Sequence, residues 1–130
     1  MSSPFATPPA GIAVGTVNLR LQAAGAGVTY RELDLRTVRD REDLMRVLAD
    51  DLALPPYFGR NLDALMEVLT DPKVFAHALA IGLCGWRRLR RAHPVLYATL
   101  EDTLLDAQRD LAGQGRALYL LELDAPTGDQ

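Results

Sequence analysis

The sequence has few of the side chains on which most enzymatic catalysis depends. Its serines are Ser2 and Ser3, at the extreme N-terminus, where no base can be positioned against them. Its histidines are His77, inside an apolar run, and His93, at a predicted helix start, and neither has a second His or Cys at metal-ligand spacing. We therefore exclude serine hydrolysis, interpret both histidines as structural, and expect no metal site.

Cysteine is almost absent as well, since Cys84 is the single one in 130 residues. No disulfide can form within the chain, and a chain of this length can bury a core without one. Cys84 lies in the apolar run 75–84, where we expect a small buried hydrophobe rather than a reactive thiol. The first eleven residues have neither the basic start nor the apolar stretch of a secretory signal, so we expect a cytoplasmic protein.

Two further features are missing. No segment approaches the ~18 consecutive apolar residues of a membrane span, so we expect no membrane partner. The glycine-containing stretch 23–27 has neither the lysine of a phosphate-binding loop nor the spacing of a dinucleotide-binding motif. We interpret these glycines as turn residues and expect no cofactor.

Charge is nearly balanced but unevenly placed, with a formal net charge of −3. After Val95 the only basic residues are Arg109 and Arg116. The carboxylates of this part are Glu101, Asp102, Asp106, Asp110, Glu122, Asp124 and Asp129. Four arginines cluster instead beside Trp86, namely Arg87, Arg88, Arg90 and Arg91. An acidic face of this kind favours a basic partner.

The pattern of apolar residues predicts an α/β domain. Strands are predicted at 12–21, 28–35, 75–84 and 117–123, and helices at 40–52, 61–69 and 94–113. We interpret the first strand as a hairpin partner of the second at the edge of the sheet, and 75–84 as a strand covered on both faces. Alternating strands and helices indicate one parallel-sheet domain over residues 12–124, with a flexible leader at 1–11 and a flexible tail at 125–130.

The most informative segment is 52–69, LALPPYFGRNLDALMEVL. Two prolines stiffen the chain ahead of Tyr57, and Gly59 permits a backbone geometry or a close approach that a side chain would forbid. Asn61 is well placed to cap a helix. In that helix Leu62, Leu65 and Leu69 are spaced to face inward, whereas Asp63 and Glu67 lie one turn apart on an exposed face. Two like charges there gain nothing for the helix itself.

Residue chemistry alone leaves alternatives open for this face. Asp63 and Glu67 form either a solvated acidic surface or a binding surface, and a general acid/base pair is disfavoured because nothing indicates a cleft around them. Tyr57 is either an aromatic anchor of an interface or a core ring whose hydroxyl reaches water.

The segment resembles the barstar family of bacterial intracellular inhibitors of the ribonuclease barnase. The matching residues are Leu54, Pro55, Tyr57, Phe58, Gly59, Asn61, Leu62, Asp63, Ala64 and Leu65. The order of the elements matches over roughly residues 28–123. The resemblance implies a small three-stranded parallel sheet packed by helices, to which the first predicted strand adds an edge strand, and it implies an inhibitor rather than an enzyme.

The resemblance also implies a mechanism, in which carboxylates on a helix enter the nuclease pocket that holds an RNA phosphate. Glu67 would occupy that pocket, Asp63 would pair with an arginine beside it, and Tyr57 would cover the catalytic histidine. The partner-binding residues implied are Tyr57, Gly59, Asn61, Leu62, Asp63, Met66, Glu67, Thr70 and Asp110. The expected partner is a small basic ribonuclease of extracellular type, or a toxin nuclease. A ridge of Asp102, Asp106 and Asp110 either steers that partner or is simply solvated.

Several departures from the family pattern fall on this surface. Glu67 is one methylene longer than the Asp of the family's best-known member, Met66 stands where the family usually has Trp, and the loop 71–73 lacks a Gly-Trp pair. Alternatives therefore stay open: an immunity protein against another toxin, a scaffold without a nuclease partner, or a nucleic-acid-binding module built on the arginine cluster. Nucleic acid is disfavoured, because Trp86 matches a core tryptophan of the family and the C-terminal half is acidic.

Overall fold

Parallel strands with helices on both faces form the structure, a computed structural model that describes residues 4–15, 18–75 and 78–124. The elements are β1 (Ile12–Val14), α1 (Leu19–Gly25), β2 (Thr29–Asp34), α2 (Arg41–Asp51), α3 (Leu62–Thr70), β3 (Leu79–Cys84), α4 (Trp86–Ala92), α5 (Pro94–Gly113) and β4 (Leu118–Leu123). Within the described residues one sheet has the order β1-β4-β3-β2, with every pair parallel. The predicted α/β class is confirmed.

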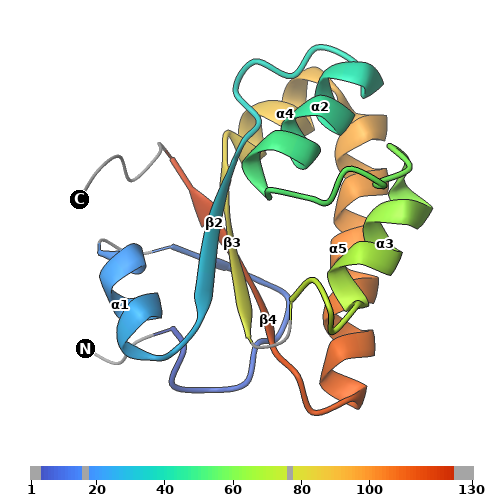
Figure 1. The fold of residues 1–130 in the computed structure, drawn as a ribbon. Coiled ribbons are helices and arrows are strands. Elements are labelled where there is room, and N and C mark those ends of the chain that lie inside the picture. Colours follow the sequence, from blue (N-terminus) through green and yellow to red (C-terminus); the bar gives the residue numbers. More distant parts are fainter. Residues whose placement is uncertain (1–3, 16–17, 76–77, 125–130) are drawn as a thin grey trace.

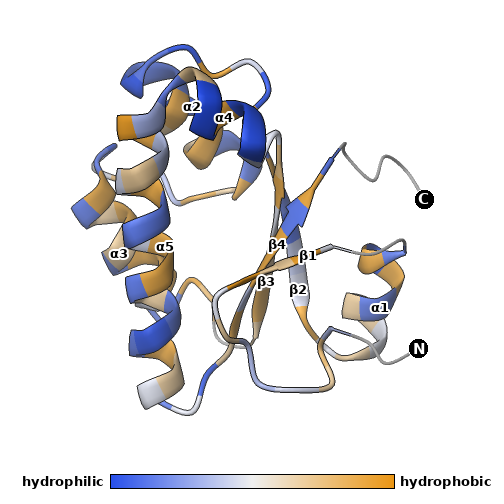
Figure 2. Ribbon diagram, turned by 180° about the vertical axis from the view of Figure 1, so that it is seen from behind, coloured by the Kyte–Doolittle hydropathy of each residue, from blue (hydrophilic) through white to orange (hydrophobic). Residues whose placement is uncertain are grey.

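The centre of the sheet is β3, all six residues of which are buried. The apolar run that predicted a strand covered on both faces is thus confirmed for residues 79–84, and Cys84 is buried at its end as expected. His77 lies outside the described residues. On one face of the sheet, leucines such as Leu33, Leu83 and Leu120 pack against helices α2 to α5 in the larger core (Figure 1). Figure 2 shows hydrophobic residues along β3 and on the helices of this layer, where they alternate with hydrophilic ones.

The other face of the sheet is covered by α1 and by the chain before β1. Leu19 and Ala23 of α1 are buried there in a second core, which also contains Tyr30 of β2 and Tyr119 and Leu121 of β4. The ring of Phe5 meets that of Tyr119 edge-on, with centroids 4.9 Å apart. The domain therefore has three layers and a separate core on each face of its sheet (Figure 1).

The predicted strand 12–21 is only partly correct. Residues 12–14 form β1, but residues 19–25 form a helix, and residue 17 lies outside the described part. Leu19 and Ala23 are four residues apart and share one buried helix face, a spacing that a short alternating apolar run also contains. The extra edge strand is confirmed, but its hairpin is wrong, because β1 runs parallel to β4 at the opposite edge from β2.

The helix starts follow the predicted caps. Asp40 Oδ1 accepts a hydrogen bond from the Asp43 N–H at 2.8 Å and begins α2. Pro94 occupies the first turn of α5, which ends at Gly113 as expected. Trp86 is 3% exposed and packs against Tyr97, so the expected core tryptophan is confirmed. Within the described ranges, no helix is long and apolar enough to cross a membrane, and no cluster of three His, Cys, Asp or Glu side chains could hold a metal ion.

Candidate functional site

The loop between α2 and α3 presents Tyr57 by burying its neighbour. The Phe58 N–H donates to the Pro55 carbonyl at 3.0 Å and closes a turn. Phe58 is 7% exposed and packs into the larger core, while Tyr57 is 70% exposed. The structure therefore excludes a core position for the Tyr57 ring and leaves it as an exposed aromatic on an anchored loop.

Gly59 and Asn61 join this loop to α3. The φ angle of Gly59 is not positive. A Cβ atom at Gly59 would lie 3.3 Å from the Ala64 Cβ, so the glycine serves a close approach. Asn61 caps α3 as predicted, accepting the Ala64 N–H at 2.7 Å, and its Nδ2 donates to the Gly59 carbonyl at 3.2 Å. Both residues thus set the geometry of the site through contacts within the chain.

Helix α3 has a buried face and an acidic face. Leu65, Val68 and Leu69 are buried, and Leu62 and Met66 are half-buried against the same core. Asp63 and Glu67 are exposed, as their spacing predicted.

The end of α3 is held by contacts from within the helix and from the loop before β4. Thr70 Oγ1 donates to the Met66 carbonyl at 2.8 Å, so its hydroxyl is used within the helix. Arg116 Nη1 donates to the Thr70 carbonyl at 3.0 Å, and Nη2 donates to the Phe75 carbonyl. This arginine, which the sequence did not single out, fixes the C-terminal end of the acidic helix.

A shallow groove of about 220 Å³ brings part of the predicted set together. Its lining consists of Tyr57, Phe58, Gly59, Ala64, Glu67, Val68 and Asp71. Tyr57 and Glu67 therefore share one concave surface, as the interface hypothesis requires. Asp71 is an addition that sequence analysis missed, because the residue was considered only as part of the loop 71–73 that departs from the family pattern. Its spacing was the available signal, since Asp63, Glu67 and Asp71 follow one another at intervals of four.

The two carboxylates of α3 have no ion-pair partner in the described part of the chain, unlike that of Asp43 in α2. No ion pair there involves Asp63, Glu67 or Asp71, although Asp71 Oδ1 accepts the Lys73 N–H at 2.8 Å. Asp43 instead binds two arginines, and the hydrogen bond from Arg39 in particular holds its pKa at about 2. The helix dipole favours Asp63 in the first turn of α3 but disfavours the two carboxylates near its C-terminus. The acidic face is thus available for an external cation.

The predicted carboxylate Asp110 stands apart from this groove. It is exposed on α5 and accepts a hydrogen bond from Gln114 Nε2 at 3.1 Å. Asp102 and Asp106 of the predicted ridge are exposed on the same helix, and Asp106 pairs with Arg109. One member of the ridge is therefore partly neutralised within the chain.

Comparison with known families gives one match. A family model described as Barstar (barnase inhibitor) matches residues 28–122. No curated protein sequence matches the chain. The matched span begins just before β2, contains the Tyr57 loop and α3, and ends within β4, so β1 and α1 lie outside it.

Proposed function

Because the chain belongs to the barstar family, we propose that it is an intracellular inhibitor of a barnase-type ribonuclease. In this proposal the acidic face of α3 enters the active site of the nuclease and takes the place of an RNA phosphate. The observation that carries the proposal is the joint exposure of Tyr57 and unpaired carboxylates on an anchored loop and helix.

The chemistry rests on charge-assisted hydrogen bonds. A ribonuclease of this kind holds the RNA phosphate with arginine, lysine and histidine side chains, which are already oriented to stabilise negative charge. A carboxylate placed among them accepts the same donors, and such bonds are shorter and stronger than neutral ones. The nuclease is thereby blocked without any reaction in the inhibitor.

Each residue has a proposed role. Glu67, which shares the groove with Tyr57, enters the phosphate pocket, and Asp63 pairs with an arginine at its rim. Tyr57 covers the catalytic histidine with its exposed ring. Asp71, at the other end of the groove, adds a further carboxylate to the rim.

The other predicted contacts frame this centre. They are Gly59, Asn61, Leu62, Met66 and Thr70, with Asp110 as a carboxylate from α5. The Asn61 cap and the Arg116 contact hold α3 before binding, which reduces the entropy lost on association.

The proposal also defines the partner. The surface offers negative charge beside one aromatic ring, so the partner is small and basic, with a cationic pocket that accepts a carboxylate. Glu67 reaches further than an aspartate would, and Met66 is smaller than tryptophan. We therefore expect the partner to have a deeper phosphate pocket, which holds the longer Glu67 side chain, and a rim that is less recessed opposite the smaller Met66.

The test is an inhibition titration. Purified protein is added to barnase and to a panel of related small basic ribonucleases, and cleavage of a fluorogenic RNA is followed. We expect at least one nuclease to lose its activity near a one-to-one ratio. The proposal is wrong if no nuclease is inhibited by an equimolar or larger amount of the protein. It is also wrong if the protein itself cleaves RNA and Glu67→Gln abolishes that cleavage.

A further inference from the structure

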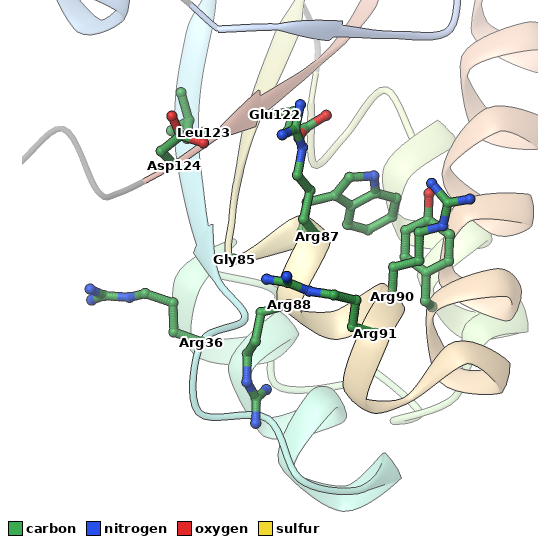
Figure 3. A pocket seen from close by; sticks show the side chains of 11 residues that line it. Arg36, Gly85, Arg87, Arg88, Arg90, Arg91, Glu122, Leu123 and Asp124 are labelled. Atoms are coloured by element: carbon green, nitrogen blue, oxygen red, sulfur yellow. The ribbon is translucent and has the colours of Figure 1, made fainter.

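A second concave site lies outside the carboxyl ends of the strands, where ligands bind in open α/β sheets. Its volume is about 930 Å³, within the roughly 300–1,000 Å³ typical of small-molecule sites. It is lined by residues at or just after the ends of β2, β3 and β4, together with α4 and the start of α5 (Figure 3). It shares no residue with the groove beside α3.

The lining is rich in guanidinium groups. Among the described residues it contains Arg36, Arg87, Arg88, Arg90 and Arg91. The carboxylates in the lining are those of Glu122 and Asp124, and Asp34 pairs with Arg36 just outside it. Arginines therefore outnumber the carboxylates even when Asp34 is counted, and the pocket has an excess of positive charge although the whole chain is acidic.

The wall of the pocket is fixed by backbone contacts. Gly85 has a φ of +78°, and a Cβ atom there would lie 3.0 Å from the Arg36 backbone nitrogen. Only glycine therefore lets the segment after β3 approach the segment after β2 this closely. Arg88 Nη1 donates to the Leu35 carbonyl at 3.2 Å and to the Val38 carbonyl at 2.7 Å. Helix α4 is thus attached to the loop after β2, which sets the positions of its other arginines.

Not all of these arginines are needed by the fold. Arg91 has no hydrogen-bond or ion-pair partner in the described part of the chain, and Figure 3 shows it extending from α4 toward the side where Arg36 lies. Arg87, one turn earlier on the same face of α4, uses its Nε atom on Glu122 Oε1 at 2.5 Å. Like charges one turn apart destabilise a helix, and the helix dipole opposes Arg87 in the first turn of α4 but favours Arg91 in the last. The Glu122 ion pair accounts for Arg87, whereas no hydrogen bond or ion pair in the described residues uses the Arg91 guanidinium.

We propose that this pocket binds a small anion with two adjacent phosphate groups, such as pyrophosphate or the diphosphate of a nucleotide. The planar donor fork of arginine matches phosphate oxygens in pairs. Arg87 and Arg91 supply the contacts with the ligand, and Arg90, 6.0 Å from the centre of the Tyr97 ring, adds positive charge at one side. Because two arginines, Arg87 and Arg91, contact the ligand, an anion with two phosphate groups can offer one phosphate to each guanidinium.

A strand of RNA or DNA fits the site less well. Stacking on an aromatic ring gives such complexes much of their affinity. Trp86 is 3% exposed and tilted against Tyr97 at 4.5 Å, so its faces cannot stack on bases. Glu122 and Asp124 would also repel a long polyanion that ran across the pocket.

Fluorescence offers a direct measurement, since Trp86 is the only tryptophan and lines the pocket. Pyrophosphate, inorganic phosphate, ADP and adenosine are titrated separately at constant ionic strength, with calorimetry as a second readout. We expect saturable one-to-one binding of pyrophosphate and ADP, weaker binding of phosphate, and none of adenosine. Tighter binding of ADP than of pyrophosphate would identify a nucleotide as the ligand, and equal binding would identify the diphosphate alone.

Variants separate the pocket from general charge effects. Arg91→Gln and Arg87→Gln should each bind pyrophosphate about tenfold more weakly, as expected for the loss of a charged hydrogen bond. Arg109→Gln, which removes an exposed arginine near the far end of α5, should bind as the parent does. The proposal is overturned if pyrophosphate does not saturate, if all three variants weaken binding equally, or if affinity rises with the length of a single-stranded oligonucleotide.

Discussion

Carboxylates on the consecutive helices α2 and α3 have opposite surroundings, and this difference predicts what removing each of them should change. Asp43 forms ion pairs with two arginines of its own chain, whereas Asp63 and Glu67 form none within the described residues. We expect Asp63→Ala and Glu67→Ala to change the free energy of unfolding by less than about 0.5 kcal/mol, as is usual for surface substitutions. Each should weaken the nuclease complex by roughly 2 to 5 kcal/mol, a range for which the barnase–barstar complex is itself a reference case.

The matched control for these variants is Asp50→Ala, which removes an exposed carboxylate near the end of α2. It should affect neither stability nor binding. Urea denaturation and surface plasmon resonance with the inhibited nuclease measure the two quantities. Variants that unfold early yet bind normally once folded would assign these carboxylates to the fold instead.

The environment of Asp43 predicts a dependence of stability on pH. Hydrogen bonds from Arg39 Nε at 2.9 Å and Arg46 Nη2 at 2.7 Å stabilise the charged form. The pKa is lowered from 3.8 to about 2, chiefly by the Arg39 side chain. Because the folded pKa lies below the unfolded one, this contribution is complete above about pH 4 and is lost as the pH falls toward 2.

The check is the urea midpoint measured across this interval for the parent and for Asp43→Asn. The parent should lose stability more steeply than the variant, which has no carboxylate to protonate at this position. Parallel curves for the two proteins would show that Asp43 does not contribute to the acid sensitivity.

Arg116 is expected to matter through the backbone that it binds. Its guanidinium satisfies the carbonyls of Thr70 and Phe75, and its Nε atom is buried without a partner in the described residues. Arg116→Met keeps the aliphatic stem but leaves both carbonyls unpaired, and should cost about 2 kcal/mol of unfolding free energy. Thermal and urea denaturation measure the loss, and Arg109→Met, at an exposed position, should be neutral.

Among the helices and strands, those determined by local chemistry were predictable. Asp40 and Asn61 begin α2 and α3 because their side chains accept the free N–H groups of the first turn, a preference that depends only on neighbouring residues. The buried stripe of α3 follows equally from its spacing. The predicted loop conformation around Tyr57 rests on the same kind of local evidence.

Elements whose position depends on distant residues were not predictable. The run from Ile12 to Leu21 fits a strand pattern, but only Ile12–Val14 pairs with β4, and Leu19 instead lies on a helix whose buried face packs in the second core. In the candidate site, Arg116 was missed for a related reason. Its role arises from the Thr70 and Phe75 carbonyls, 46 and 41 residues earlier in the chain, and no short window of sequence contains all three residues.

At the scale of the whole molecule, the distribution of charge predicts the rate at which a basic partner associates. Asp102 and Asp106 are exposed on α5, the helix against which α3 packs, and neither lines the groove. Charges at a rim mainly alter association, whereas buried charges mainly alter dissociation. Asp102→Asn with Asp106→Asn should slow association several-fold at low salt and leave dissociation nearly unchanged.

Stopped-flow mixing with the nuclease at two salt concentrations tests this prediction. The difference from the parent should shrink as the screening length falls from ~30 Å at 0.01 M to ~8 Å at physiological strength. The charge-conserving double variant Asp102→Glu with Asp106→Glu should associate like the parent. Faster association after neutralisation would mean that the partner presents negative charge to α5.

The position of β1 beside β4 has a consequence for synthesis on the ribosome. Of the described strands, β1 is the first in the chain and β4 the last, and β4, with Leu120 opposite Ile12, is the only sheet neighbour of β1 in the described structure. Because β4 also lies between β1 and β3, the sheet cannot be completed strand by strand as the chain emerges. A nascent chain stalled before residue 118 would leave β1 unpaired and one edge of β3 open, the kind of exposed edge that promotes aggregation. The sheet can therefore be completed only after β4, Leu118–Leu123, has left the ribosome.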